Sequence, residues 1–253
     1  MATAIMPDPQ MPMVFADIHC HILFGVDDGA RSEQEMLELL DAAYHDGTRE
    51  LCFTPHYHPA YFGASPEQID AAFQTANAYV SQKYPDLHLY LGSELRYEQS
   101  FSDWLKSKRC RTLNGTEYLL ADFLSGDALD MIVKAMLNVI NCGYRPVLAH
   151  VERYEALQKR QEELRQLKTW GTIFQIDAQS LLGGFGYGAK KRSRRLLEEG
   201  MVDLIASDAH DMQSRSPDLR PCYSYIVKKY GQTLSRRLFY ENPMHILRGE
   251  AFR

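Results

Sequence analysis

Seven short apolar runs alternate with helical patterns along this chain, and this alternation constrains the fold more than any other feature. The runs occupy residues 14–20, 50–54, 87–93, 117–122, 145–150, 172–177 and 202–207. Strands that alternate with helices predict parallel pairing, because each crossover between parallel strands needs about a helix's length of chain. The chain has 253 residues, and a (β/α) barrel typically needs about 250. We therefore predict one barrel-like α/β domain over residues 14–253, preceded by a flexible extension at 1–13.

Start and stop signals place the helices between these runs. Ser32 opens a capping-box pattern, and Gly47 supplies a stop. Ser65-Pro66 puts proline at the first position of the next helix, and Asp127 is suited to cap the helix that follows it. We expect helices from 32 to 47, from 65 to about 83, and over 128–142, 155–170 and 189–199.

Composition argues against several classes of partner. The net charge of -5, with 24% charged residues, offers no basic field for nucleic acid. No apolar run approaches the roughly 20 residues that span a membrane. Residues 1–13 hold three prolines and no apolar segment flanked by positive charge, so we do not expect a secretory signal. The five cysteines form no C-x-x-C pair, which favours reduced thiols and a cytoplasmic location.

Most of the histidines and several carboxylates lie where the apolar runs end. Parallel strands of a barrel bring their C-terminal ends to one rim, where barrel enzymes carry their chemistry. Imidazole and carboxylate groups crowded on such a rim are suited to bind divalent metals. The sequence therefore predicts a metalloenzyme, and the residues concerned are His19, His21, His56, Glu94, Asp122, His150, Asp208 and His210.

The spacing of these residues adds detail. His19 and His21 point to the same side of a strand, because strand side chains alternate with a period of two. A single buried histidine is more often structural, but two at this spacing favour a metal site. Either histidine in Thr54-Pro55-His56-Tyr57-His58 could be a ligand, and we prefer His56 because it is closer to the strand end. Glu94 is a candidate bridging carboxylate between two cations. The other histidines, His45, His88 and His245, are expected to be structural or exposed.

Several segments together resemble the PHP (polymerase and histidinol phosphatase) superfamily, over about residues 14 to 249. The match is closest to its bacterial branch of metal-dependent protein-tyrosine phosphatases encoded with capsule and exopolysaccharide genes. The segments that carry it are Asp17-Ile18-His19-Cys20-His21, Asp27-Asp28-Gly29, Thr54-Pro55-His56-Tyr57, Gly92-Ser93-Glu94, Leu148-Ala149-His150-Val151-Glu152-Arg153-Tyr154 and Ala206-Ser207-Asp208-Ala209-His210.

The resemblance implies the PHP fold, a single-domain distorted (β/α)7 TIM-like barrel that holds three divalent metals. Mn²⁺ is the expected metal, although Fe, Co and Zn suit the same ligand types. Asp122 stands where the family usually has Glu, so a metal there would be held through water or more weakly. The ligands carried over are His19, His21, Asp28, His56, Glu94, Asp122, His150, Asp208 and His210.

The implied activity is hydrolysis of phosphotyrosine in a protein substrate such as a bacterial tyrosine kinase, in the regulation of capsular polysaccharide synthesis. Arg153 and Arg215 lie three and five residues after His150 and His210, and match family positions. We predict that they bind the phosphate, because guanidinium grips phosphate in a fork and stabilises developing charge.

Two alternatives stay open from the sequence. A small-molecule phosphomonoesterase, such as a histidinol-phosphate phosphatase, would need the same metal rim. A non-catalytic, metal-stabilised scaffold is disfavoured, because all nine carried-over positions hold side chains able to bind metal. A thiol mechanism is excluded, because cysteine-dependent phosphatases need C-x5-R and no arginine stands six residues after any of the cysteines, which are Cys20, Cys52, Cys110, Cys142 and Cys222.

One glycine-rich segment has no role in this scheme. Residues 183–188 follow a strand and precede a basic helix that starts near Lys190. We interpret them as a flexible loop near the rim that shapes substrate access. Phosphate binding by their backbone N–H groups is the alternative.

Overall fold

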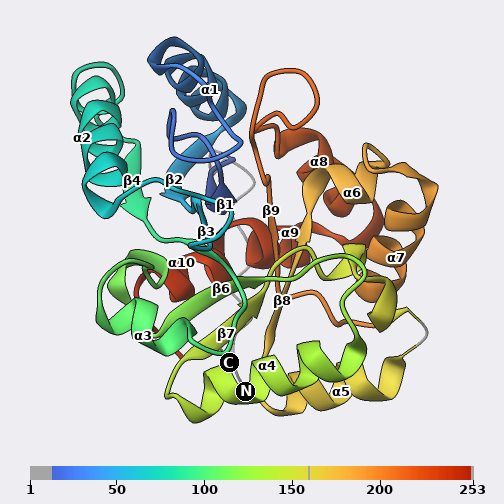
Figure 1. Ribbon diagram of the computed structural model, residues 1–253. Helices are drawn as coiled ribbons and strands as arrows, with labels where there is room; N and C mark the ends of the chain where they lie inside the picture. Colours follow the sequence, from blue (N-terminus) through green and yellow to red (C-terminus); the bar gives the residue numbers. More distant parts are fainter. Residues whose placement is uncertain (1–12, 159, 252–253) are drawn as a thin grey trace.

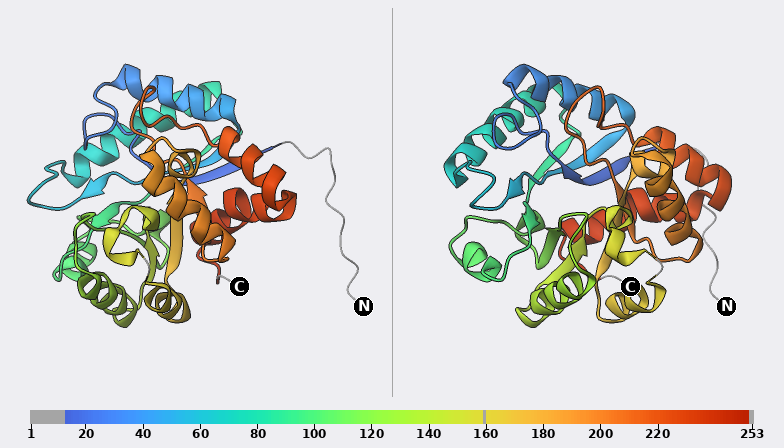
Figure 2. Two further views of the ribbon diagram at one scale, coloured as in Figure 1. Left: turned by 90° about the vertical axis from the view of Figure 1, so that its right-hand side faces the viewer. Right: turned by 45° about the vertical axis from the view of Figure 1, so that its right-hand side comes forward.

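The computed structural model describes residues 13–158 and 160–251. The expected extension at 1–13 lies, apart from Met13, outside the described residues. A curled, wholly parallel sheet forms the centre of the molecule, and helices cover its outside (Figures 1 and 2). Its described strands are β1 (Phe15–Cys20), β2 (Thr48–Phe53), β3 (His56–Tyr57), β4 (His88–Leu91), β5 (Glu94–Arg96), β6 (Tyr118–Asp122), β7 (Arg145–Leu148), β8 (Ile173–Asp177) and β9 (Leu204–Ala206).

The strands occupy seven positions around a distorted barrel. They pair in two groups, β1-β2-β4 and β3-β5-β6-β7-β8-β9. A two-residue interruption separates β2 from β3, and another separates β4 from β5, so each of these pairs fills one position. Backbone hydrogen bonds from Gly92 N–H to Phe53 O and from Glu94 N–H to Pro55 O continue the pairing across the interruptions.

The ring closes between β1 and β9 through sparse contacts. Cys20 and Ala209 form an isolated parallel bridge. The His21 N–H donates to Ala209 O at 2.7 Å, and the Asp208 N–H donates to His19 O at 2.9 Å. The expected α/β barrel with seven strand positions is therefore confirmed in a distorted form. Its closure brings the end of β9 beside the end of β1.

The helices largely follow the predicted pattern. In Figures 1 and 2, α1 and α2 lie side by side over one part of the sheet, and α4 and α5 lie side by side over another. The described helices are α1 (Glu33–Asp46), α2 (Pro66–Lys83), α3 (Phe101–Lys106), α4 (Leu129–Asn141), α5 (Gln161–Thr169), α6 (Ala178–Leu182), α7 (Gly186–Glu198), α8 (Arg220–Tyr230), α9 (Gln232–Arg236) and α10 (Asn242–Leu247), with a π-helical segment at Arg237–Glu241 and 3-10 turns at Leu113–Gly115, Val151–Arg153 and Glu155–Leu157.

Capping chemistry explains where several of these helices begin. Ser65 and Gln68 form a complete capping box at α2, and the Ser32 side chain accepts the Glu35 N–H at α1. The prediction for Asp127 is wrong. Ala128 is the N-cap of α4, and the Asp127 carboxylate instead accepts the Leu124 N–H at 2.7 Å within the preceding turn.

Three large apolar clusters stabilise the barrel. One joins α1 and α2 to β1 and β2, and a second joins β6–β8 to α4, α5, α7 and α8. A third joins β1, β6, β7, β8 and β9 to α10, so the C-terminal helix links strands from both groups. Strands covered on both faces read as continuous apolar runs, which is why the runs were visible in the sequence.

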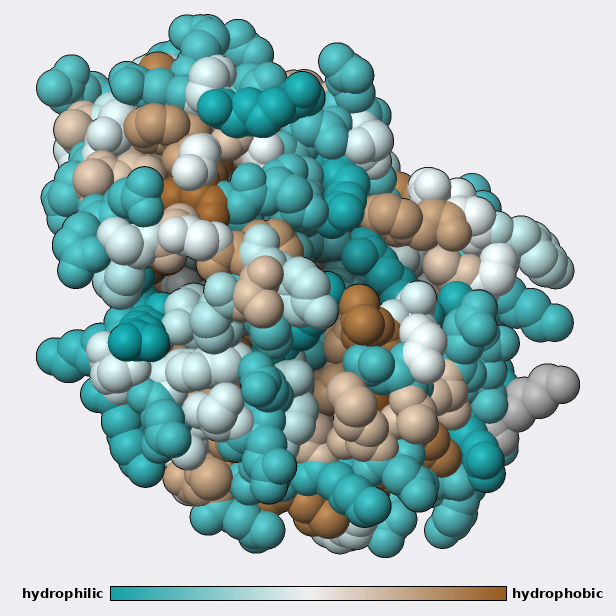
Figure 3. Space-filling view, viewed as in Figure 1, coloured by the Kyte–Doolittle hydropathy of each residue, from teal (hydrophilic) through white to brown (hydrophobic). Residues whose placement is uncertain are grey.

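The outer surface is mainly polar. On the face seen in Figure 3, hydrophilic residues dominate and hydrophobic residues lie in small groups. Within the described residues, no helix is long and apolar enough to span a membrane. Exposed large apolar side chains are scattered, at Tyr61, Leu124, Met131, Leu182, Tyr187 and Met212.

Candidate metal centre

The ends of the parallel strands bring the nine predicted ligands into one network of close contacts. His19 lies in β1, and His21 follows it. His56 and Glu94 begin β3 and β5, the short strands that resume after the interruptions. The remaining members end β6 (Asp122), follow β7 (His150), follow β9 (Asp208 and His210), or lie in the loop before α1 (Asp28).

Two of these residues adopt left-handed backbone conformations. His150 has φ 33° and Asp208 has φ 54°. Residues other than glycine rarely occupy this region, and such conformations concentrate at functional sites where the surrounding structure imposes them. Each turns the chain sharply where a strand has just ended.

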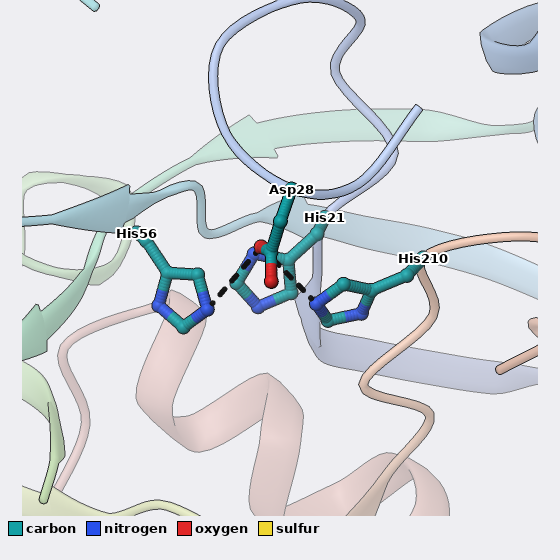
Figure 4. Close-up of side chains that lie close together, drawn as sticks. All are labelled: His21, Asp28, His56 and His210. Atoms are coloured by element: carbon teal, nitrogen blue, oxygen red, sulfur yellow. Dashed lines mark ion pairs between the residues drawn. The ribbon is translucent and has the colours of Figure 1, made fainter. Parts of the chain in front are cut away.

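Four side chains form the first donor group, shown in Figure 4: His21, Asp28, His56 and His210. Asp28 Oδ1 lies 3.5 Å from His56 Nε2 and 3.6 Å from His210 Nε2. One ligand atom from each residue lies within 4.8 Å of the others. The group combines one carboxylate with three imidazoles, a donor set suited to a divalent transition metal.

Glu94 belongs to two further donor groups, one with His19 and His21 and one with His56 and Asp122. Its Oε1 lies 3.3 Å from His19 Nε2, and its Oε2 lies 2.8 Å from His56 Nδ1. The carboxylate thus stands between the groups, as expected of a bridge. Burial opposes its ionisation, but His19 and His56 hold the pKa of Glu94 well below its usual range.

Two predicted ligands complete the network outside these three groups. His150 Nε2 lies 2.9 Å from Glu94 Oε1 and 3.6 Å from Asp122 Oδ1. Asp208 Oδ1 lies 3.4 Å from His19 Nε2. Both residues are buried. All nine predicted ligands therefore lie in one cluster, and their assignment to individual cations remains a proposal.

The arrangement of imidazole nitrogens fits bound cations. The Nδ1 atoms of His19 and His21 face acceptor oxygens of Gln175 (2.9 Å) and Asp27 (2.7 Å). If these Nδ1 atoms carry the protons, both Nε2 atoms present lone pairs, and those atoms lie only 3.3 Å apart. His56 Nδ1 and Glu94 Oε2 are both buried and lie 2.8 Å apart, but their orientation does not form a hydrogen bond. Lone pairs that converge in this way are stabilised by a cation between them.

Several residues that support the cluster were not identified from sequence. Gln175 in β8 accepts from the His150 backbone N–H and donates to Asp177. Arg96 binds Asp122 Oδ2 at 2.7 Å, which leaves Oδ1 facing His150. The available signal for Gln175 was a polar residue inside an apolar run. The structure shows it fully buried, and such groups need partners.

The two predicted arginines line a cavity of about 350 Å³ beside the cluster. Arg153 Nη2 lies 2.7 Å from Asp208 Oδ2 and 2.5 Å from Asp177 Oδ2. Arg215 Nη1 lies 3.3 Å from Asp208 Oδ2. The cavity wall also includes Asp28, His56, Phe62, Glu94, Arg96, Asp122, Phe123, Leu124, Ser125, His150, Tyr154 and Asp208. Both arginines therefore stand where a phosphate could meet the metal-binding side chains.

The structure separates the other histidines and the thiols from this cavity. His58 pairs with Glu98 at 3.3 Å and packs against Trp104, which supports the preference for His56. None of the residues lining the cavity is a cysteine. Cys20 is buried among apolar side chains, and burial raises the pKa of its thiol well above the usual value.

Comparisons with known proteins agree with this geometry. The family described as capsular polysaccharide synthesis, CpsB/CapC, matches residues 15–248. The tyrosine-protein phosphatase CpsB of Streptococcus pneumoniae is 34% identical over 236 residues, which are 91% of this chain and 97% of that protein.

Solved structures give the same result. One match comes from the crystal structures of YwqE from Bacillus subtilis and CpsB from Streptococcus pneumoniae, which are described as unique metal-dependent tyrosine phosphatases. The TM-score is 0.85 at 30% identity, and the match covers 94% of this chain and 96% of that chain. Histidinol phosphate phosphatase from Lactococcus lactis has a TM-score of 0.56 at 16% identity, covering 87% of this chain and 94% of that one. At this low identity the match shows only that the two proteins share a fold. The chain belongs to the CpsB/CapC family of capsular polysaccharide synthesis.

Proposed function

We propose that this chain is a metal-dependent protein-tyrosine phosphatase that acts in capsular polysaccharide synthesis. The observation that carries the proposal is one cavity lined by both arginines and by six of the nine predicted metal ligands. The family match and the similarity to CpsB support the same activity. A bacterial tyrosine kinase is the proposed protein substrate. A cytoplasmic location is proposed because all five cysteines are free thiols.

The nine clustered residues are the proposed ligands of three divalent cations, with Mn²⁺ as the first candidate. His21, Asp28, His56 and His210 would hold one cation, and Glu94 would be shared by the other two donor groups. Cations bound there would lower the pKa of water enough to make it a nucleophile at neutral pH. Asp27 and Gln175 orient His21 and His19 through their Nδ1 atoms, as outer partners of metal ligands commonly do.

The arginines are proposed to bind the phosphate. Their guanidinium groups reach the cavity from two different segments, one after β7 and one after β9. Each would donate to non-bridging oxygens, whose charge they help to neutralise as the phosphorus–oxygen bond breaks. Asp208 contacts both guanidinium groups and keeps them near the cavity.

The cavity also suits the aromatic part of the substrate. Phe62 and Phe123 lie in its wall, and Phe62 stacks on His56 with ring centroids 4.5 Å apart. Aromatic walls accept a phenyl ring well. The tyrosine oxygen is also a good leaving group, because its pKa near 10 allows it to depart as a phenolate.

Steady-state kinetics on three substrates would test this function. Phosphotyrosine peptide, phosphoserine peptide and histidinol phosphate are compared at equal metal concentration, with Mn²⁺, Fe²⁺, Co²⁺ and Zn²⁺ each tried. We expect phosphotyrosine peptide to give the highest kcat/KM. Faster hydrolysis of histidinol phosphate would instead identify a small-molecule phosphatase.

A further inference from the structure

The glycine-rich segment between α6 and α7 places one aromatic ring beside the phosphate-binding arginines. Gly183 and Gly186 have φ values of +109° and +85°, and glycine adopts these left-handed conformations without strain. Only residues 183–185 form a turn, since α6 ends at Leu182 and α7 begins at Gly186. The interpretation of 183–188 as a loop is therefore wrong for residues 186–188, which are helical. Phe185 stands between the two helices and is partly buried.

The Phe185 ring lies against both arginines. Its centroid is 4.0 Å from Cζ of Arg153 and 6.0 Å from Cζ of Arg215. Both distances are within the range of cation–π attraction. The arginines line the cavity, whereas Phe185 does not. The ring therefore contacts the guanidinium groups from outside the cavity wall.

The turn is also anchored to the segment that carries Arg215. The Gln179 backbone carbonyl in α6 accepts N–H groups of Gly183 and Gly184, both at 2.9 Å. The Gln179 side chain lies 3.3 Å from Ser216 Oγ, one residue beyond Arg215. Gln179 thus connects the turn that carries Phe185 to the segment that carries Arg215.

We propose that Phe185 is a positioning residue that holds both guanidinium groups toward the substrate phosphate. A guanidinium stacked on a ring keeps its edge N–H groups free for a fork-like contact with phosphate. Asp208 restrains the same two arginines on another side, at 2.7 and 3.3 Å. Groups held in place before substrate arrives lose less freedom on binding. The inference rests on the proposed function, in which these arginines bind phosphate.

The test uses Phe185→Leu, which keeps apolar cover but removes the ring, and Phe185→Trp, which keeps a ring. Tyr187→Leu is the matched control, because Tyr187 lies two residues further along, in the first turn of α7, and is 80% exposed. Four quantities are measured: kcat and KM on phosphotyrosine peptide, the affinity for inorganic phosphate by calorimetry, and metal content. Phe185→Met is the second apolar replacement should leucine prevent folding.

We expect Phe185→Leu to weaken inorganic phosphate binding and lower kcat/KM by about three- to thirtyfold, in line with cation–π strength. Metal content should not change, and Phe185→Trp and Tyr187→Leu should stay near wild type. In an Arg153→Ala background, Phe185→Leu should cost markedly less than it does alone, because interacting residues are not additive.

Two results would overturn the proposal. Unchanged phosphate binding with a raised KM for the peptide would show that the ring contacts the substrate directly. Full additivity with Arg153→Ala would show that Phe185 does not act through that arginine. If wild-type protein failed to hydrolyse the peptide, the proposed function would fail, while phosphate calorimetry would still test Phe185.

Discussion

Glu94 is the carboxylate of the cluster that contacts the most imidazoles. Its Oε1 lies 3.3 Å from His19 Nε2 and 2.9 Å from His150 Nε2, and its Oε2 lies 3.2 Å from His21 Nε2 and 2.8 Å from His56 Nδ1. Four imidazoles therefore surround one fully buried carboxylate. Among the described residues it is the one carboxylate that belongs to two donor groups, and His21 and His56 also belong to two each.

Replacement of this charge should remove metal. Glu94→Gln keeps the shape of the side chain but cannot balance the charge of two cations. Changes in the residues that support metal ligands already cost about 10–100-fold in metal affinity or activity. We therefore expect Glu94→Gln to lower metal affinity and turnover by at least about a hundredfold. Metal analysis and turnover are measured together. His58→Ala serves as the control, and equal metal content in both variants would contradict the bridging role.

Arg153 and Arg215 should affect turnover without affecting metal content. Loss of one donor to developing negative charge costs about a hundred- to thousandfold in kcat, which is the expected effect of either change to alanine. Both arginines pair with Asp208, but Arg153 also pairs with the buried carboxylate of Asp177. Arg215→Ala is therefore the cleaner variant, because removal of one partner from a buried ion pair is destabilising by itself. Arg31→Ala on the surface is the control. Near wild-type kcat in Arg215→Ala would exclude this arginine from phosphate binding.

At the scale of elements, the loop between β1 and α1 folds back on the strand that it leaves. The Ala30 N–H donates to His21 O at 3.2 Å, and the Gly29 N–H donates to Asp27 Oδ1 at 3.1 Å. A Cβ added at Gly29 would lie 1.8 Å from His21 O. This close approach explains why glycine occupies position 29, directly after Asp27 and Asp28. The positions of both aspartates depend on the conformation of this loop.

Gly29→Ala should therefore disturb the first donor group. The added methyl must push the loop away, and Asp28 would lose its place beside His56 and His210. We expect turnover to fall at least about tenfold, with reduced metal content, because a misplacement of about 1 Å can cost a hundredfold in rate. Gly126→Ala is the matched control, since a Cβ there meets nothing within 4 Å. Full activity of Gly29→Ala would show that the loop adapts.

At the scale of the whole molecule, the candidate metal centre lies across the place where the barrel closes, between the ends of β1 and β9. Its residues come from β1, β3, β5 and β6 and from the segments after β1, β7 and β9. The ring itself closes between β1 and β9 through one isolated bridge and its neighbouring hydrogen bonds. Bound cations would cross-link this closure, so metal binding and folding should be coupled.

Chelation should accordingly remove both activity and stability. EDTA treatment is expected to abolish phosphatase activity, and Mn²⁺ is expected to restore it. Each site would add about 2.7 kcal/mol to the free energy of unfolding when free metal exceeds its Kd a hundredfold. Calorimetric unfolding with and without Mn²⁺ measures this change. Metal-stripped protein with full activity would contradict the proposed function.

The ligand cluster and most of the architecture were predictable from local patterns. Buried parallel strands read as apolar runs, so each run placed one strand of the barrel. Polar residues at the ends of these runs, such as His19, Glu94 and Asp208, had to meet wherever the strand ends meet. The CpsB/CapC membership followed from the same motifs. The helices α6, α8, α9 and α10 were not predicted, because their patterns were not separated from the loops around them.

What the sequence determined by itself was the alternation of strands and helices and the set of candidate ligands, because both depend on residues close together in the chain. The tertiary structure alone decided the pairings across long separations. These include Gln175 against His19, Arg96 against Asp122 and the Phe185 ring against two arginines. Their partners lie 156, 26 and about 30 residues away. No local pattern encodes such contacts, because they form only when the closing barrel brings its loops together.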